Sequence, residues 1–157
     1  MPGFERYVRT ETIFSTIGTL VVTAFLYSLM FGFAGPVPVR GVGAYAFDFV
    51  PQAFMTALIC IWVPGAMTRK RLARGAIAAL PAMKLPASPL VLRGFTYGVL
   101  ALLIGSGSVI TALLLGEYHE IDWLVGLTGK LAFGGMVAAI ATPMGLRALF
   151  RQASNRR

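Results

Sequence analysis

The sequence predicts an all-α integral membrane protein, a four-helix bundle with both ends of the chain in the cytoplasm. The first observation is composition: 57% of the 157 residues are hydrophobic and 13% are charged, with a mean hydropathy of +0.75. Soluble domains carry about 25% charged residues. The second is four long runs with at most one charge, each matching the roughly 20 apolar residues of a membrane span. The third is that basic residues gather at both ends of the chain and between the second and third runs, which marks the cytoplasmic side.

The first span is predicted over residues 12–33, after a short amphipathic lead. Four threonines recur on one face of this helix, where their hydroxyls can bond to the preceding turn or to another helix: Thr12, Thr16, Thr19 and Thr23. Pro36 and Pro38 follow and prevent the helix from continuing. The first span therefore runs outward and ends in an external loop.

The second span is predicted over residues 49–67. A polar stripe recurs along it every four residues and consists of Asp48, Gln52, Thr56 and Cys60. Pro64 lies near its inner end, where we expect a kink or the end of the helix.

A basic cluster opens the cytoplasmic segment 68–93 and consists of Arg69, Lys70, Arg71 and Arg74. It predicts a topology anchor, and the same charges suit the binding of anionic lipid head groups. Three prolines interrupt residues 76–92, so we expect this stretch to lie along the membrane interface and not to form one regular helix.

The third span is predicted over residues 94–115. Small residues recur along it at steps of four and three, in a seam that consists of Gly94, Gly98, Ala101, Gly105, Ser108 and Ala112. Small residues let membrane helices approach closely, so the seam predicts a tight helix contact, within the chain or with a partner.

The fourth span, residues 123–146, contains the sharpest candidate site, because Lys130 interrupts an otherwise apolar run. An ionisable residue inside a span indicates a functional site, although a lysine can also extend its stem to the membrane surface. Small residues continue the face of Lys130 and predict that it points at a partner helix: Gly134, Ala138, Ala141 and Gly145.

Asp48 is the expected partner of Lys130, because it also lies near the outer end of a span, with Gln52 and Thr56 below it. The outer turn offers alternative carboxylates nearer the surface, namely Glu117, Glu120 and Asp122. We predict that Lys130 and Asp48 pair across the second and fourth spans.

Two stretches of the chain resemble each other and suggest an internal repeat. Residues 53–64 align with residues 132–143 at an offset of 79, with Ala, Phe, Ile and Pro in common. Each stretch then enters basic sequence. The chain is therefore predicted to be two copies of a two-helix hairpin, related by an axis along the membrane normal.

A hairpin whose second helix carries a late proline and then a basic cluster resembles an uncharacterised family of bacterial two-span membrane proteins. The residues that carry the resemblance are Pro64 with Arg69 to Arg71, and Pro143 with Arg147 and Arg151. The second half lacks the tight basic run. The resemblance implies a location in the bacterial cytoplasmic (inner) membrane.

Catalysis, metals and cofactors find little support. His119 is the one imidazole, and its neighbours are the carboxylates of a short turn, without a thiolate to complete a zinc site. We recognise no nucleophile–base pair, paired carboxylates or phosphate loop, and we expect no enzyme, metal or cofactor. The net charge of +8 is explained by topology, so we expect no nucleic acid partner.

Two functions remain. The first is a structural or accessory subunit that packs against a membrane-protein partner or a second copy. The second is a small transporter or channel that works as a homo-oligomer, with Lys130 and Asp48 as a gate. The direction of the polar stripes distinguishes them: stripes that meet in a dry bundle favour the subunit, and stripes that line a polar path favour transport.

Overall fold

The structure is a computed structural model, and it describes residues 2–74 and 90–154. Within these ranges four helices are long and apolar enough to cross a membrane: Gly3–Phe31, Phe49–Leu72, Leu90–Leu115 and Trp123–Phe150. The predicted all-α fold with four membrane-spanning helices is therefore confirmed.

The first, second and fourth spans are single α-helices, and the third contains a π-helical segment. In chain order the helices are α1 (Pro2–Phe31), α2 (Phe49–Ala73), α3 (Leu90–Leu100), η1 (Ala101–Ser106), α4 (Gly107–Leu115) and α5 (Trp123–Ser154). The segments α3, η1 and α4 follow one another directly and form one span.

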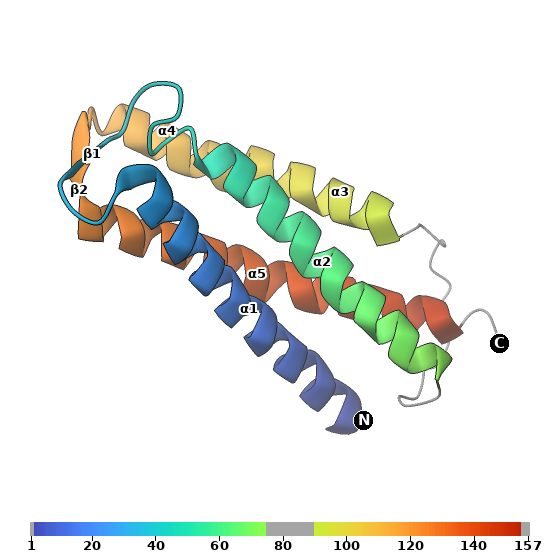
Figure 1. Cartoon of the computed structure of the whole chain (residues 1–157). Coiled ribbons are helices and arrows are strands. Elements are labelled where there is room, and N and C mark those ends of the chain that lie inside the picture. Colours follow the sequence, from blue (N-terminus) through green and yellow to red (C-terminus); the bar gives the residue numbers. More distant parts are fainter. Residues whose placement is uncertain (1, 75–89, 155–157) are drawn as a thin grey trace.

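The second and fourth spans form the centre of the bundle. Helices α2 and α5 pack along each other, α1 packs along α5, and α3 packs along α2 (Figure 1). The start of α1 and the end of α5 lie at one end of the bundle, where the rings of Phe4 and Phe150 are 4.8 Å apart. We call this the basic end and the opposite one the outer end.

The helices continue beyond the predicted spans. Helix α2 passes through Pro64 and the basic cluster to Ala73, and α5 passes through Pro143. Of the two alternatives expected at Pro64, the end of the helix was wrong, because a proline removes one backbone hydrogen bond and membrane helices tolerate this within a packed bundle. The segment between the spans is accordingly shorter than 68–93, since α3 begins at Leu90. Its expected place along the interface concerns mainly residues outside the described ranges.

The small-residue seam of the third span divides at the π-helical segment η1. Gly94 and Gly98 are buried against α2, where an added Cβ would lie 2.9 Å from side-chain atoms of Leu58 and Phe54. Ala101 and Gly105 are half-buried, whereas Ser108 and Ala112 are exposed.

The π-helical geometry explains this division. A π-helical turn bonds residue i to i+5 and inserts an extra residue, which rotates everything beyond it. Past η1, the partly buried positions are Val109, Ile110 and Leu113, and no longer Ser108 and Ala112. Within the chain, the inner half of the seam makes a close contact and Ser108 and Ala112 do not, so a contact of the outer half with a partner stays a prediction.

The outer end is closed by a small sheet that the sequence analysis did not predict. Strand β1 (Pro36–Pro38) pairs antiparallel with β2 (Glu120–Asp122), with Val37 opposite Ile121. Val37 and Val39 are buried, and the N–H of Val39 donates to the carbonyl of His119 over 2.9 Å. The loops that follow the first and third spans are thus joined into one cap.

The packing is compatible with two related hairpins, but the aligned register is not. The first helix of each hairpin packs on the second helix of the other: α1 on α5, and α3 on α2. The offset of 79, however, pairs Ile61 with Ile140, which are 1% and 55% exposed. It also pairs buried Ala53 with exposed Ala132. Because the alignment superposes opposite helix faces, the duplication stays a prediction.

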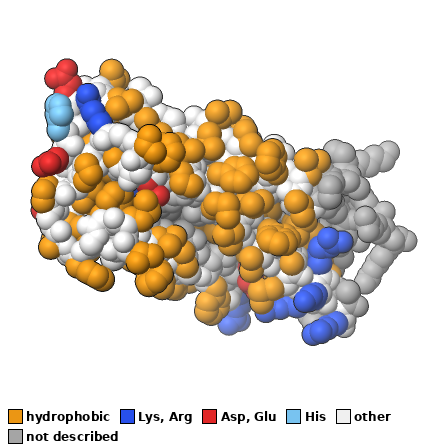
Figure 2. Space-filling model, turned by 45° about the horizontal axis from the view of Figure 1, so that its top comes forward, with side chains coloured by type: hydrophobic (Ala, Val, Ile, Leu, Met, Phe, Trp, Pro, Cys, Tyr) orange, Lys and Arg blue, Asp and Glu red, His pale blue; other side chains and the backbone are white. Residues whose placement is uncertain are grey.

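Charge is distributed as a membrane protein requires. Figure 2 shows most of the lysine and arginine side chains gathered at one end, the histidine and acidic side chains with a basic side chain beside them at the other end, and hydrophobic side chains over the surface between the two ends. Large apolar side chains are exposed along the spans, for example Phe25 at 66% and Leu103 at 64%. Such a surface needs lipid as its solvent.

Candidate functional site

The structure brings Lys130 of α5 and Asp48 at the start of α2 together. Lys130 Nζ lies 2.9 Å from Asp48 Oδ2, and the two side chains are 1% and 20% exposed. The lysine side chain is therefore enclosed and does not extend to the membrane surface. The pairing that the sequence predicted is present, while a role for it in function stays a prediction.

The position of Asp48 leaves its carboxylate free for this pair. Asp48 is the N-cap residue of α2, where an aspartate commonly accepts hydrogen bonds from the first backbone N–H groups. It makes no such side-chain bond here. Asp122, one of the alternative partners of Lys130, does cap its helix, because its Oδ1 accepts from the N–H of Leu124 over 2.9 Å.

Two aromatic rings cover the ammonium group. Lys130 Nζ lies 3.6 Å from the ring centroid of Phe49 and 5.0 Å from that of Tyr45. The negative face of an aromatic ring attracts a cation, and it does so most where water is excluded. Tyr45 is held in place because its hydroxyl donates to the carbonyl of Gly126 over 2.9 Å.

Gln52 connects the ion pair to the polar stripe below it. Its Nε2 donates to the backbone carbonyl of Lys130 over 3.1 Å. Thr23 of α1 is buried nearby, and a Cβ added to Gly134 would lie 3.0 Å from Gln52 Nε2 and 3.2 Å from Thr23 Oγ1. Gly134 thus provides the space in which polar groups from α1 and α2 meet α5.

The remaining polar positions continue this contact toward the basic end. Thr19 Oγ1 lies 3.5 Å from the sulfur of Cys60, which is buried, and Thr56 is half-buried between Gln52 and Cys60. The predicted small-residue face of α5 is buried along its whole length: Gly134, Ala138, Ala141 and Gly145. The polar stripes of α1 and α2 therefore face the inside of the bundle.

One residue of the basic cluster makes a contact that the sequence did not predict. Arg69, Lys70 and Arg74 are exposed, but Arg71 turns toward α1. Its Nη1 forms an ion pair with Glu11 Oε1 at 2.6 Å and donates to the hydroxyl of Tyr7 over 3.1 Å. Sequence reasoning missed this contact, because nothing in the spacing of the chain links residue 71 to the first turns of α1.

Sequence reasoning also missed that aromatic residues at the outer end help to position Lys130. Tyr45 is 4% and Tyr27 is 2% exposed, so both rings are buried in the bundle. The Tyr27 hydroxyl donates to the carbonyl of Trp123 over 3.1 Å, and the indole N–H of Trp123 donates to the carbonyl of Gly32 over 2.9 Å. These bonds fix the start of α5 and hence the height of Lys130 in the bundle.

Comparisons with family models, with curated proteins and with solved structures found no match for this chain. The function must therefore be argued from the site. Within the described ranges, His, Cys, Asp and Glu side chains form no group of three or more that could hold a metal ion.

Proposed function

We propose that this protein is a structural or accessory subunit of the bacterial cytoplasmic membrane, which packs against a membrane-protein partner. One observation carries the proposal: the polar side chains of α1, α2 and α5 contact one another inside the bundle. A pair such as Lys130 and Asp48, covered by two rings, holds helices in register. Groups that serve transport need contact with water or substrate instead.

The outer face of α4 is a suitable contact for the partner. The π-helical segment turns Ser108 and Ala112 outward, where small side chains allow another helix to come close. Lipid tails are as apolar as leucine, so close packing and not hydrophobicity would stabilise the contact.

Transport by a homo-oligomer is the second candidate, because the ion pair is near the outer end and Asp48 is 20% exposed. In that case a second copy would complete a path, and the pair would open and close it. The exposed part of Asp48 favours this reading, and the rings over Lys130 oppose it.

Native mass spectrometry of tagged protein, extracted gently from its own membrane, tests the proposal. A larger membrane protein at a fixed ratio is expected. The double variant Ser108→Leu/Ala112→Leu should reduce this ratio, whereas Leu103→Ala on the same span should not. If the protein and its variants are all extracted as homo-oligomers without another protein, the proposed subunit role is contradicted. Flux assays on variants of Lys130 and Asp48 would then test transport.

A further inference from the structure

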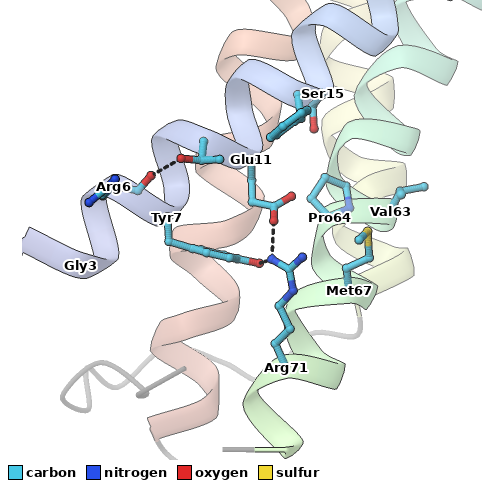
Figure 3. Close-up of a pocket in the computed structure, with 11 residues that line it drawn as sticks. Gly3, Arg6, Tyr7, Glu11, Ser15, Val63, Pro64, Met67 and Arg71 are labelled. Carbon is cyan, nitrogen blue, oxygen red and sulfur yellow. Dashed lines mark hydrogen bonds and ion pairs between the residues drawn. The ribbon is translucent and has the colours of Figure 1, made fainter. Parts of the chain in front are cut away.

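A groove between α1 and α2 at the basic end has the polarity of a phospholipid. It encloses about 680 Å³. The residues that line it include Arg6, Glu11, Phe14, Val63, Met67 and Arg71. We call it the α1–α2 groove. Figure 3 shows Arg71 reaching from α2 toward Glu11 and Tyr7 on α1, with Met67, Pro64 and Val63 along the same wall.

Polarity in the groove changes with depth along α2. Arg71 lies at the basic end, Met67 is one turn deeper, and Val63 is two turns deeper. At 1.5 Å per residue these steps are about 6 Å and 12 Å toward the middle of the span. Phe14, Val63 and Met67 are 69%, 47% and 45% exposed, so the groove opens sideways toward lipid. A ligand for it has a charged head at the membrane surface and an apolar tail.

The charges of the groove favour an anionic head. Arg6 and Arg71 stand against one carboxylate, Glu11. The Arg71 side chain is 43% exposed despite its ion pair with Glu11, so its guanidinium has donors left for a phosphate. Arginine binds phosphate oxygens with several N–H groups at once.

We propose that the α1–α2 groove binds one anionic phospholipid, whose phosphate lies at Arg71 with Arg6 at the rim. One acyl chain follows Phe14, Met67 and Val63 toward the middle of the membrane. Nonspecific attraction would involve Arg69, Lys70, Arg71 and Arg74 alike, whereas this site uses Arg71 alone of the four, together with Arg6 of α1. The site is independent of the subunit role proposed above.

Titration of delipidated protein in detergent with phosphatidylglycerol, followed by native mass spectrometry, tests this site. One tightly bound lipid is expected. The variant Arg6→Gln/Arg71→Gln should weaken its apparent affinity about tenfold, because charge-assisted hydrogen bonds to the phosphate are lost. The matched control Arg69→Gln/Arg74→Gln removes the same charge from exposed positions outside the groove and should change the affinity less than about twofold. Equal losses in the two variants would overturn the site.

A second pair of variants tests the groove without changing charge. Ser15→Trp places a ring in the groove and should abolish the bound lipid, whereas Ile17→Trp on an exposed face of α1 should not. This pair keeps the proposal testable if loss of the Arg71–Glu11 contact unfolds the protein. Retention of the lipid by Ser15→Trp, or its full displacement by glycerol phosphate at equal concentration, would overturn the proposal; the latter would indicate a site for soluble anions.

Discussion

At the scale of single residues, the sequence located the pair but not its surroundings. Lys130 and Asp48 could be predicted because each is a charge in apolar sequence, and such charges need partners. The rings of Phe49 and Tyr45 could not be predicted to cover the ammonium, because Tyr45 comes from the external loop. Its place depends on a hydrogen bond to Gly126, far along the chain.

The contributions of Lys130 and Asp48 to the free energy of unfolding should depend strongly on each other. Asp48→Asn leaves a buried ammonium without its counter-charge, and we expect a loss of about 3–5 kcal/mol in the free energy of unfolding. The double variant Asp48→Asn/Lys130→Met should lose less than the sum of the two single variants, by about 1–3 kcal/mol. Chemical unfolding in mixed micelles measures all three variants.

The exposed pair of Glu5 and Arg147 provides the control for this cycle, because its N–O distance is 3.2 Å and its side chains are 61% and 51% exposed. Its coupling should be about 0–1 kcal/mol. Additive effects at Lys130 and Asp48 would mean that the two residues do not act as a pair.

The hydroxyl of Tyr45 should matter apart from its ring. Tyr45→Phe keeps the ring beside Lys130 and removes the hydroxyl that donates to the carbonyl of Gly126, so we expect a loss of about 0.5–1.5 kcal/mol in unfolding free energy. Tyr118→Phe, at an exposed tyrosine of the outer turn, is the control. Equal stability of the two variants would argue against a role for this hydrogen bond.

At the scale of helices, residue spacing predicted the four spans but not their ends or irregularities. Helix α2 continues through Pro64, because in a membrane bundle the loss of one hydrogen bond does not break a helix. The π-helical segment η1 has no signal in the spacing of small residues. The spacing therefore predicted that the small residues beyond Ala101 share the same contact face, whereas η1 rotates the helix and moves them away from it.

Larger side chains should destabilise the protein when they replace small residues in the inner half of the seam, but not in the outer half. Gly98→Leu would force a side chain against Phe54, since even a Cβ would lie 2.9 Å from its ring and 3.2 Å from its carbonyl oxygen. We expect a loss of about 1–3 kcal/mol in unfolding free energy. Ala112→Leu, on the exposed outer half, should stay within about 0.5 kcal/mol in isolated protein. The opposite order would refute the placement of η1.

At the scale of the whole molecule, charge asymmetry predicted an orientation and hydropathy predicted the fold class. Neither could predict the small sheet β1–β2, because each strand has three residues and β1 contains two prolines, so no strand pattern is visible. The structure brings the start of α1 and the end of α5 to the same end, as the predicted topology requires. Its assignment to the cytoplasm is a prediction from the basic residues.

Thiol labelling of intact cells tests this orientation. In a Cys60→Ala background, His119→Cys should react with a membrane-impermeant maleimide, and Lys70→Cys should react only after the membrane is opened. Both positions are exposed at opposite ends of the bundle. The reverse pattern would place the basic end outside.

We propose that the polar groups of α1, α2 and α5 meet in a dry interior, and the native Cys60 reports on this interior directly. Its side chain is buried at 4% exposure beside Thr19 and lies in the middle of α2. Labelling with a small, charged methanethiosulfonate reagent in the native membrane is the measurement, with His119→Cys as the accessible control. We expect Cys60 to stay unmodified until the protein is unfolded. Modification of Cys60 in the folded protein would reveal a water-filled path through the bundle and would favour transport over the subunit.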